Sequence, residues 1–164
     1  MITLNMKHRH GGKLIFGFPG VGKSVAASIN HSCIDLESSH FKNDTQFPCR
    51  YCEVAYELSM QGNCVFMSTH QAVRDFICNN YLNQLLAYNV KVCILCPDIS
   101  LKNDWIKRLY NRYIKQPSSK NQRAYENVKN NFDQYVQELN DYAHTHQLEL
   151  INIKELDYNL LDLI

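Results

Sequence analysis

Residues 13–24 read Lys13-Leu-Ile-Phe-Gly-Phe-Pro-Gly-Val-Gly-Lys-Ser24. The first five residues form an apolar run that ends in glycine, which favours a buried strand, and the small apolar residues after Gly22 suit a helix. Between them, Gly17 to Ser24 match the pattern Gly-x-x-x-x-Gly-Lys-Ser in full. A glycine-rich loop of this pattern between a strand and a helix is typical of a phosphate-binding loop.

Each residue type in this loop has a physical role. Glycines let the backbone turn tightly and direct N–H groups at phosphate oxygens, and the start of the following helix adds its positive dipole end. Lys23 would bridge the β- and γ-phosphates, and the Ser24 hydroxyl would bind Mg²⁺. We therefore expect ATP as the phosphoryl donor, with Mg²⁺, held by Gly17, Pro19, Gly20, Val21, Gly22, Lys23, Ser24 and Val25.

Apolar runs and helical periodicities alternate along the rest of the chain. Strands are predicted over residues 13–17, 32–36, 63–68, 90–96 and 148–153, and helices over 22–30, 48–61, 71–88, 99–114, 124–144 and the last few residues. This alternation predicts an α/β, three-layer fold with a five-stranded parallel sheet and helices on both faces. We expect a flexible leader over residues 1–12, a single domain over 13–164, a loop over 115–122, and a helical lid over about 98–122.

Length and composition limit the functional classes. The chain has 164 residues, of which 45% are hydrophobic and 20% are charged, so one globular domain is expected and disorder is not. Lys and Arg number 17 against 16 Asp and Glu, and this balance argues against a protein that binds duplex DNA through its charge. No apolar run is long enough to span a bilayer, and no signal-peptide core is visible. A soluble, cytoplasmic protein without a membrane partner is the expectation.

Seven cysteines include two Cys-x-x-Cys pairs, Cys49/Cys52 and Cys93/Cys96. An odd number of cysteines without an export signal argues against a disulfide framework. The second pair lies in a predicted strand, where residues three apart point to opposite faces, so one metal ion would not easily hold both. We interpret the cysteines as small buried thiols rather than a structural zinc site.

The acidic residues separate the classes of phosphate-loop protein. The chain lacks the Asn/Thr-Lys-x-Asp segment of GTPases, and its third predicted strand ends Phe66-Met-Ser-Thr69 without the carboxylate of motor and transporter ATPases. The second predicted strand instead carries Asp35 at its carboxyl end. A carboxylate there can take a proton from an acceptor hydroxyl, or hold Mg²⁺ directly or through water, as a kinase for a small acceptor requires.

Basic residues gather between Lys102 and Lys129, where eight Lys and Arg stand against two acids. Arg108 and Arg112 are four apart and share one helix face. Phosphoryl transfer spreads negative charge over the equatorial oxygens, which arginines on a lid can neutralise. The alternative interpretation is that these basic residues lie on a helix face that is exposed to solvent.

Several weaker candidates could line the acceptor site or contact phosphate, although each also has a structural interpretation as a cap, a loop residue or a surface charge. Glu37, Ser38, Ser39 and His40 follow the second strand, Ser68 and His70 follow the third, and Arg50 and Arg74 could hold an acceptor phosphate. Trp105 and Tyr135 fit helix faces and are expected in the core rather than stacked on a base.

Four segments together resemble the small nucleoside- and nucleotide-kinase-like phosphate-loop proteins encoded by bacteriophages, and the resemblance extends from about Lys13 to Ile153. The segments are Gly17-Phe-Pro-Gly-Val-Gly-Lys-Ser24, Asp35-Leu-Glu-Ser-Ser-His-Phe41, Val65-Phe-Met-Ser-Thr-His-Gln-Ala-Val-Arg-Asp75 and Cys96-Pro-Asp-Ile-Ser-Leu-Lys-Asn-Asp-Trp-Ile-Lys-Arg108-Leu-Tyr-Asn-Arg112. The wider nucleoside monophosphate kinase group implies five parallel strands, an acceptor site near the second strand, with Asp35 as its carboxylate, and Arg108 and Arg112 as lid arginines. A phage-encoded protein would act in the host cytoplasm. The chain lacks the Asp-Gly-Phe-Pro-Arg segment of adenylate kinases, so the resemblance leaves the acceptor open.

Three functions remain as hypotheses. The first is an ATP- and Mg²⁺-dependent phosphotransferase acting on a nucleotide or nucleoside-like acceptor, with Lys23, Asp35, Arg108 and Arg112 as its catalytic residues. The second uses the same chemistry on the 5′-hydroxyl end of a single-stranded nucleic acid, along which the basic stretch would lie. The third is a nucleotide-binding regulatory protein without efficient transfer, which the missing carboxylate after the third strand favours.

Overall fold

A computed structural model describes residues 11–164. Its five strands form one all-parallel sheet in the spatial order β2-β3-β1-β4-β5. The strands are β1 (Lys13–Gly17), β2 (Cys33–Asp35), β3 (Cys64–Met67), β4 (Lys91–Pro97) and β5 (Glu149–Ile153). The predicted α/β fold and its five parallel strands are thus confirmed. The expected leader, residues 1–12, lies outside the described residues except for Gly11 and Gly12.

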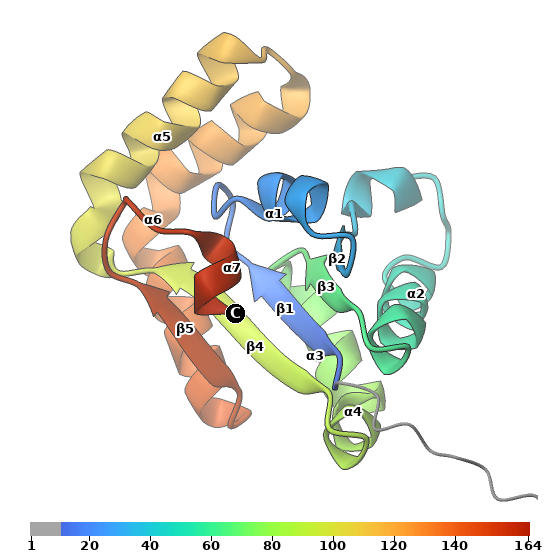
Figure 1. Cartoon of the computed structure of the whole chain (residues 1–164). Helices are drawn as coiled ribbons and strands as arrows, with labels where there is room; N and C mark the ends of the chain where they lie inside the picture. Colours follow the sequence, from blue (N-terminus) through green and yellow to red (C-terminus); the bar gives the residue numbers. More distant parts are fainter. Residues whose placement is uncertain (1–10) are drawn as a thin grey trace, which may run out of the picture.

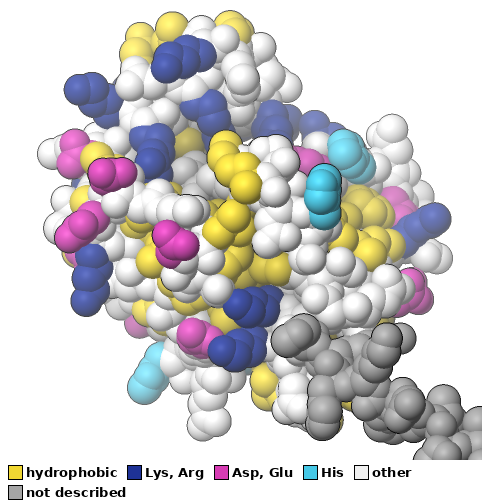
Figure 2. All heavy atoms as spheres, viewed as in Figure 1, with side chains coloured by type: hydrophobic (Ala, Val, Ile, Leu, Met, Phe, Trp, Pro, Cys, Tyr) yellow, Lys and Arg dark blue, Asp and Glu magenta, His cyan; other side chains and the backbone are white. Residues whose placement is uncertain are grey.

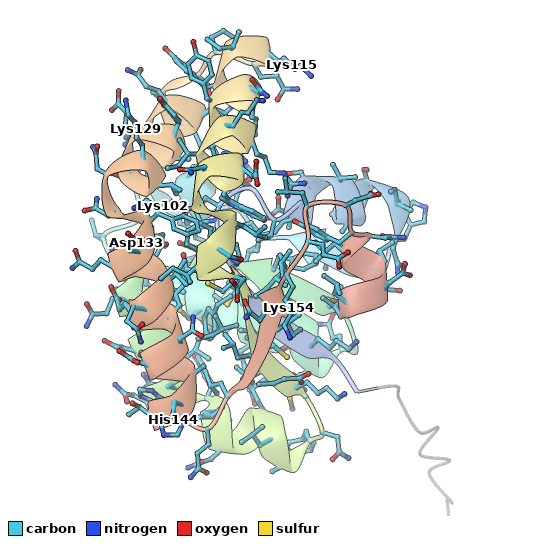
Figure 3. The ribbon with its side chains drawn as sticks, turned by 90° about the vertical axis from the view of Figure 1, so that its left-hand side faces the viewer. Lys102, Lys115, Lys129, Asp133, His144 and Lys154 are labelled. Carbon is cyan, nitrogen blue, oxygen red and sulfur yellow. The ribbon has the colours of Figure 1, made fainter. Side chains whose placement is uncertain are left out.

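Helices cover both faces of the sheet, as Figures 1 and 3 show. Helices α1 (Lys23–Ile29) and α7 (Leu160–Leu163) lie on one face. The opposite face carries α2 (Cys49–Met60), α3 (Gln71–Asn80), α4 (Leu82–Ala87) and α6 (Ser119–Thr145). Short 3₁₀ helices, η1 (Ser38–Phe41) and η2 (Ile99–Leu101), follow β2 and β4. The result is a three-layer arrangement.

The core lies along the central strands. Leu14, Ile15 and Phe16 of β1 are fully buried, and β4 is buried from Val92 to Pro97. A strand covered on both faces has no solvent side, which explains why these runs are continuously apolar rather than alternating. Because all five strands are parallel, the carboxyl ends of β1, β2 and β3 meet at one edge of the sheet, where polar side chains can gather.

Two predicted boundaries are wrong. The single helix expected over 71–88 is two helices, α3 and α4, interrupted at Tyr81, whose φ of −125° is not helical and whose ring stacks on Tyr56 at 4.4 Å. The loop expected over 115–122 is shorter, because α6 begins at Ser119. Ser118 is its N-cap, and its hydroxyl accepts a hydrogen bond from the Asn121 amide. A pair of serines that suggested a loop therefore starts a helix.

Helix α5 (Lys102–Lys115) and the first half of α6 form a hairpin that projects beyond the sheet edge (Figure 1). This hairpin, with η2, occupies the region where the lid was expected. At its base Lys102 and Asp133 point toward one another, 2.5 Å apart, while Lys115 lies at the far end (Figure 3). Helix α6 departs from helical geometry at Asn131, beyond which Phe132, Val136 and Leu139 pack into the core. The base of the hairpin is therefore fixed to the core through the second half of α6.

Among residues 11–164, no helix is both long and apolar enough to cross a bilayer. Over the same residues, no three His, Cys, Asp or Glu side chains gather in a group that could hold a metal ion. Cys93 and Cys96 are buried on β4, and their thiols donate to different acceptors, the Glu149 carboxylate and the Pro97 carbonyl. All seven cysteines are free thiols.

Candidate functional site

A cavity of about 1120 Å³ opens at the carboxyl edge of the sheet. Its floor is the loop between β1 and α1, one wall is the end of β2, and the opposite wall is the α5–α6 hairpin. All eight loop residues expected to bind the donor line it, and so do Asp35, Glu37, Ser38, Arg108 and Arg112. Ser39 and Arg74 do not. The structure therefore brings most of the sequence-predicted residues to one place.

The chemistry of the loop depends on a close approach at its first glycine. A Cβ atom built on Gly17 would lie 2.8 Å from Cδ of Lys23 and 3.3 Å from a methyl carbon of Val21. The lysine side chain therefore folds directly over this glycine, and its ammonium group donates a 3.0 Å hydrogen bond to the Gly17 carbonyl. Any larger residue at position 17 would displace Lys23.

Lys23 is a half-buried cation at the cavity floor. Burial lowers the pKa of its ammonium group, and the carboxylates of Asp35 and Glu37 oppose that change. A desolvated ammonium group gains most from an anion placed beside it, because the electrostatic interaction is strong where water is excluded. This environment suits a lysine that contacts phosphate oxygens.

Ser24 and Asp35 lie together, as expected for a shared role. The Ser24 hydroxyl, in the first turn of α1, donates a 2.9 Å hydrogen bond to Oδ2 of Asp35 at the end of β2. Mg²⁺ prefers hydroxyl, carboxylate and water oxygens. These two side chains are therefore the ones that could hold Mg²⁺ beside the loop, directly or through water.

Residues after β2 reach the hairpin. The carboxylate of Glu37 forms an ion pair with the Lys120 ammonium at the start of α6, so the pair closes one side of the cavity. Ser38 lines the cavity next to it, whereas Ser39 and His40 do not. Of the residues at the end of β2 and after it that were predicted for the acceptor site, Asp35, Glu37 and Ser38 therefore line the cavity.

The two expected lid arginines differ in their contacts. Arg112 is half-buried and its Nε atom, although buried, has no hydrogen-bond partner among the described residues. Burial lowers its pKa, and Glu37 opposes this change. Arg108, by contrast, is occupied: its guanidinium donates to the Tyr158 hydroxyl at 2.9 Å and to the Leu156 carbonyl at 3.2 Å. Of these two arginines, Arg112 is therefore the one with a buried donor that has no partner among the described residues.

The end of β3 contributes hydroxyl groups rather than a carboxylate. Ser68 and Thr69 line the cavity, and the Thr69 hydroxyl is hydrogen-bonded to Tyr135 of α6, which also lines it. Tyr135 packs against the core beside Phe18, as expected, and in addition lines the cavity, while Trp105 is fully buried as expected. His70 is the N-cap of α3, where its ring accepts a hydrogen bond from the Ala72 amide. Arg50 is exposed on α2, away from the cavity.

Arg74 is a structural residue, contrary to its predicted role at the acceptor site. It lies on α3 with 1% of its surface exposed, donates from Nε to the Thr69 carbonyl at 2.8 Å, and pairs with Glu138 of α6. Its guanidinium also packs 4.3 Å from the ring centre of Tyr142. These contacts join α3 to the anchored half of α6, so the arginine is used within the fold.

Replacing Arg74 by methionine tests this correction. We expect the variant to lose about 2 kcal/mol of unfolding free energy, because the hydrogen bond and the ion pair disappear. Nucleotide affinity should stay within about twofold of the unsubstituted protein, because the side chain does not face the cavity. Chemical denaturation and a binding titration measure the two quantities. If the variant bound nucleotide more weakly while its unfolding free energy stayed unchanged, Arg74 would be a binding residue after all.

Several lining residues were missed by the sequence reasoning. Lys115, Gln116 and Lys120 come from the hairpin, and Tyr158, Asn159 and Leu160 come from the segment between β5 and α7. Both lysines lie in the basic stretch between Lys102 and Lys129, but the charge of that stretch did not indicate which of its residues line a site. Figure 2 shows Lys and Arg side chains gathered over the projecting hairpin. No periodicity in the segment around Tyr158 indicated that it reaches the loop.

The donor set fits a nucleoside triphosphate with Mg²⁺. The loop has the close approach at Gly17, a desolvated lysine, and a hydroxyl–carboxylate pair of oxygen ligands. The cavity volume of about 1120 Å³ is slightly above the roughly 300–1,000 Å³ of typical small-molecule sites. No protein-family model matches the chain, and a comparison with curated proteins finds no significant match. The function of the protein must therefore follow from this geometry and its chemistry.

Proposed function

We propose that the protein is an ATP- and Mg²⁺-dependent phosphotransferase that moves the γ-phosphoryl group to a nucleotide or nucleoside-like acceptor. One observation carries this proposal: a single cavity has the Lys23 loop and the Ser24–Asp35 pair at one side and, at the other, Arg112, whose buried Nε atom has no hydrogen-bond partner within residues 11–164. A donor and an acceptor could both enter a cavity of about 1120 Å³.

The loop side would bind the donor. Its backbone amides and Lys23 would hold the phosphates, and Ser24 and Asp35 would hold Mg²⁺, which when bound neutralises charge on the phosphate oxygens. In this role the Lys23 ammonium group would exchange its 3.0 Å hydrogen bond with the Gly17 carbonyl for contacts with phosphate oxygens. Binding would thus exchange a hydrogen bond to a neutral carbonyl for an ionic contact with phosphate.

The acceptor side would position the hydroxyl and screen the reaction. Asp35 would orient the acceptor hydroxyl or accept its proton, and Arg112 would neutralise charge on the transferred group. The Glu37–Lys120 pair and the hairpin would limit access of water, which otherwise competes as acceptor. Each of these roles falls on a residue that lines the cavity.

A polynucleotide 5′-hydroxyl kinase is the second candidate. The observation in its favour is the row of basic residues Arg112, Lys115 and Lys120 along the hairpin wall, which could follow a phosphodiester strand. Binding of an oligonucleotide would then weaken steeply with salt. A regulatory nucleotide-binding protein is the third, in keeping with Ser68 and Thr69 where a carboxylate would otherwise follow β3.

A transfer screen with γ-labelled ATP over nucleosides, mononucleotides and oligonucleotides separates these functions. We expect a labelled mononucleotide or nucleoside product in the presence of Mg²⁺. Asp35→Asn should lower the transfer rate by about 10²–10³-fold, while ATP affinity without Mg²⁺ stays unchanged. Asp104→Asn, which alters an exposed carboxylate at the start of α5, is the matched control.

The screen has three informative results. Label in oligonucleotides alone would favour the polynucleotide kinase. Slow release of inorganic phosphate with no labelled acceptor would favour the regulatory protein. Undiminished transfer by Asp35→Asn would contradict the role assigned to this carboxylate.

A further inference from the structure

Three consecutive carbonyl groups of the phosphate loop are bound by side chains from distant parts of the chain. Trp105 Nε1 donates to the Pro19 carbonyl at 2.8 Å, Arg108 Nη1 approaches the Gly20 carbonyl at 3.4 Å, and the Tyr158 hydroxyl donates to the Val21 carbonyl at 2.8 Å. Trp105 and Arg108 belong to α5, and Tyr158 lies between β5 and α7. We name these three residues the loop clamp.

The members of the loop clamp also hold one another. The rings of Trp105 and Tyr158 stack with an interplanar angle of 5°, and the Arg108 guanidinium lies 4.8 Å from the ring centre of the first and 5.2 Å from that of the second. Arg108 donates to the Tyr158 hydroxyl as well. Such a mutually packed group has little rotamer freedom, so the positions of its donors are fixed before any ligand binds.

The loop approaches the clamp at a position that admits glycine alone. Gly20 has a φ of +88°, and a Cβ atom there would lie 2.9 Å from a methyl carbon of Leu109 and 3.3 Å from Nε1 of Trp105. The middle glycine of the motif therefore serves the contact with α5 as well as the turn itself. This close approach ties the loop to the hairpin wall.

Holding carbonyl groups on one side determines where the amides point. In a trans peptide the carbonyl of one residue and the N–H of the next face opposite ways. With the Pro19 and Val21 carbonyls bound to the clamp, the N–H groups of Gly20 and Gly22 are turned away from it. Over residues 11–164, neither amide has a hydrogen-bond partner within the protein. Both glycines line the cavity.

We propose that Trp105, Arg108 and Tyr158 are positioning residues that preorganise the phosphate loop, so that the amides of Gly20 and Gly22 face the triphosphate before it arrives. A glycine-rich loop without such contacts would have to be ordered by the ligand, at a cost in affinity. This inference rests on the proposed function, because it assumes that the loop binds a triphosphate. It gives Arg108 a role different from the lid role that the sequence suggested.

The Tyr158→Phe variant tests the loop clamp, because it removes one hydroxyl and leaves the stacked ring in place. We expect its dissociation constant for ATP to rise about five- to tenfold, the loss typical of one hydrogen bond. In the nucleotide-free protein, amide hydrogen exchange at Gly20 and Gly22, followed by NMR, should become faster. Tyr110→Phe, which removes an exposed hydroxyl from α5, should change neither quantity.

Kinetics adds a readout that a purely structural role would not move. Tyr158→Phe should raise KM for ATP while kcat and KM for the acceptor remain unchanged, because the hydroxyl contacts the donor loop and Arg108 but not Asp35, Glu37 or Ser38. Arg108→Lys should show the same pattern, since an ammonium group keeps the charge but not the fork that contacts three oxygens. All measurements are made well below the melting temperature of each variant.

The proposal requires both changes in Tyr158→Phe. Faster exchange with unchanged ATP affinity, or weaker ATP binding with unchanged exchange, would overturn it. Failure of the proposed function looks different, because in that case the unsubstituted protein itself would bind no ATP. If the unsubstituted protein binds ATP and Tyr158→Phe binds it with the same affinity, the role of the loop clamp alone is overturned.

Discussion

Replacing Lys23 by methionine is expected to reduce phosphoryl transfer by about 10³-fold or more and to weaken ATP binding, while the fold is retained. Methionine keeps the aliphatic length that packs on Gly17 but carries no charge. Because burial already lowers the pKa of the lysine, removal of the ammonium group from the nucleotide-free protein should cost no stability. Turnover with γ-labelled ATP and thermal unfolding measure the two effects.

Lys107→Met is the matched control for this substitution. Lys107 is exposed on α5 and does not line the cavity, so its loss should leave transfer within about twofold of the unsubstituted rate. Retained transfer in Lys23→Met, with Lys107→Met equally active, would refute the assignment of the loop as the donor site.

The second large effect is expected at Arg112. Arg112→Met should lower kcat by about 10³-fold, because an arginine that neutralises charge in phosphoryl transfer contributes about that much. The melting temperature should stay the same or rise, because the substitution removes a buried Nε–H that has no partner among the described residues. Loss of activity without loss of stability is the signature of a side chain kept for a ligand.

Arg123→Met provides the comparison on the same hairpin, since Arg123 is exposed on α6 and contacts the Ser119 carbonyl within its own helix. Its kcat should match that of the unsubstituted protein. An Arg112→Met enzyme with a normal kcat would show that the charge of the transferred group is neutralised elsewhere, and Lys115 or Lys120 would then be the next residues to substitute.

The fold was largely predictable because its signals are local. Apolar runs such as residues 13–17 and 90–96 mark strands buried on both faces, and the glycine loop fixes the strand–loop–helix order. The two helix boundaries that were predicted wrongly depend instead on contacts and capping, which the local sequence pattern does not specify. Ser118 is a helix cap that resembles a loop residue, and Tyr81 interrupts a helical pattern by stacking on a tyrosine of α2.

The candidate site was predictable where one segment carries its residues and not where two distant segments must meet. Asp35 was predictable because it ends a strand whose carboxyl end lies at the same edge of the sheet as the loop. Arg74 was misplaced because its partner, Glu138, lies 64 residues further along the chain. Tyr158 was missed because its contact with Val21 joins residues 137 apart. No sequence periodicity records contacts of that separation.

Calorimetric titration of the unsubstituted protein with ATP, with and without Mg²⁺, tests the central claim most directly. We predict saturable binding of one nucleotide per chain, tighter when Mg²⁺ is present and lost in Lys23→Met. No saturable binding of ATP or of any other nucleoside triphosphate, with or without Mg²⁺, would contradict the assignment of the Gly17–Ser24 loop as a triphosphate site.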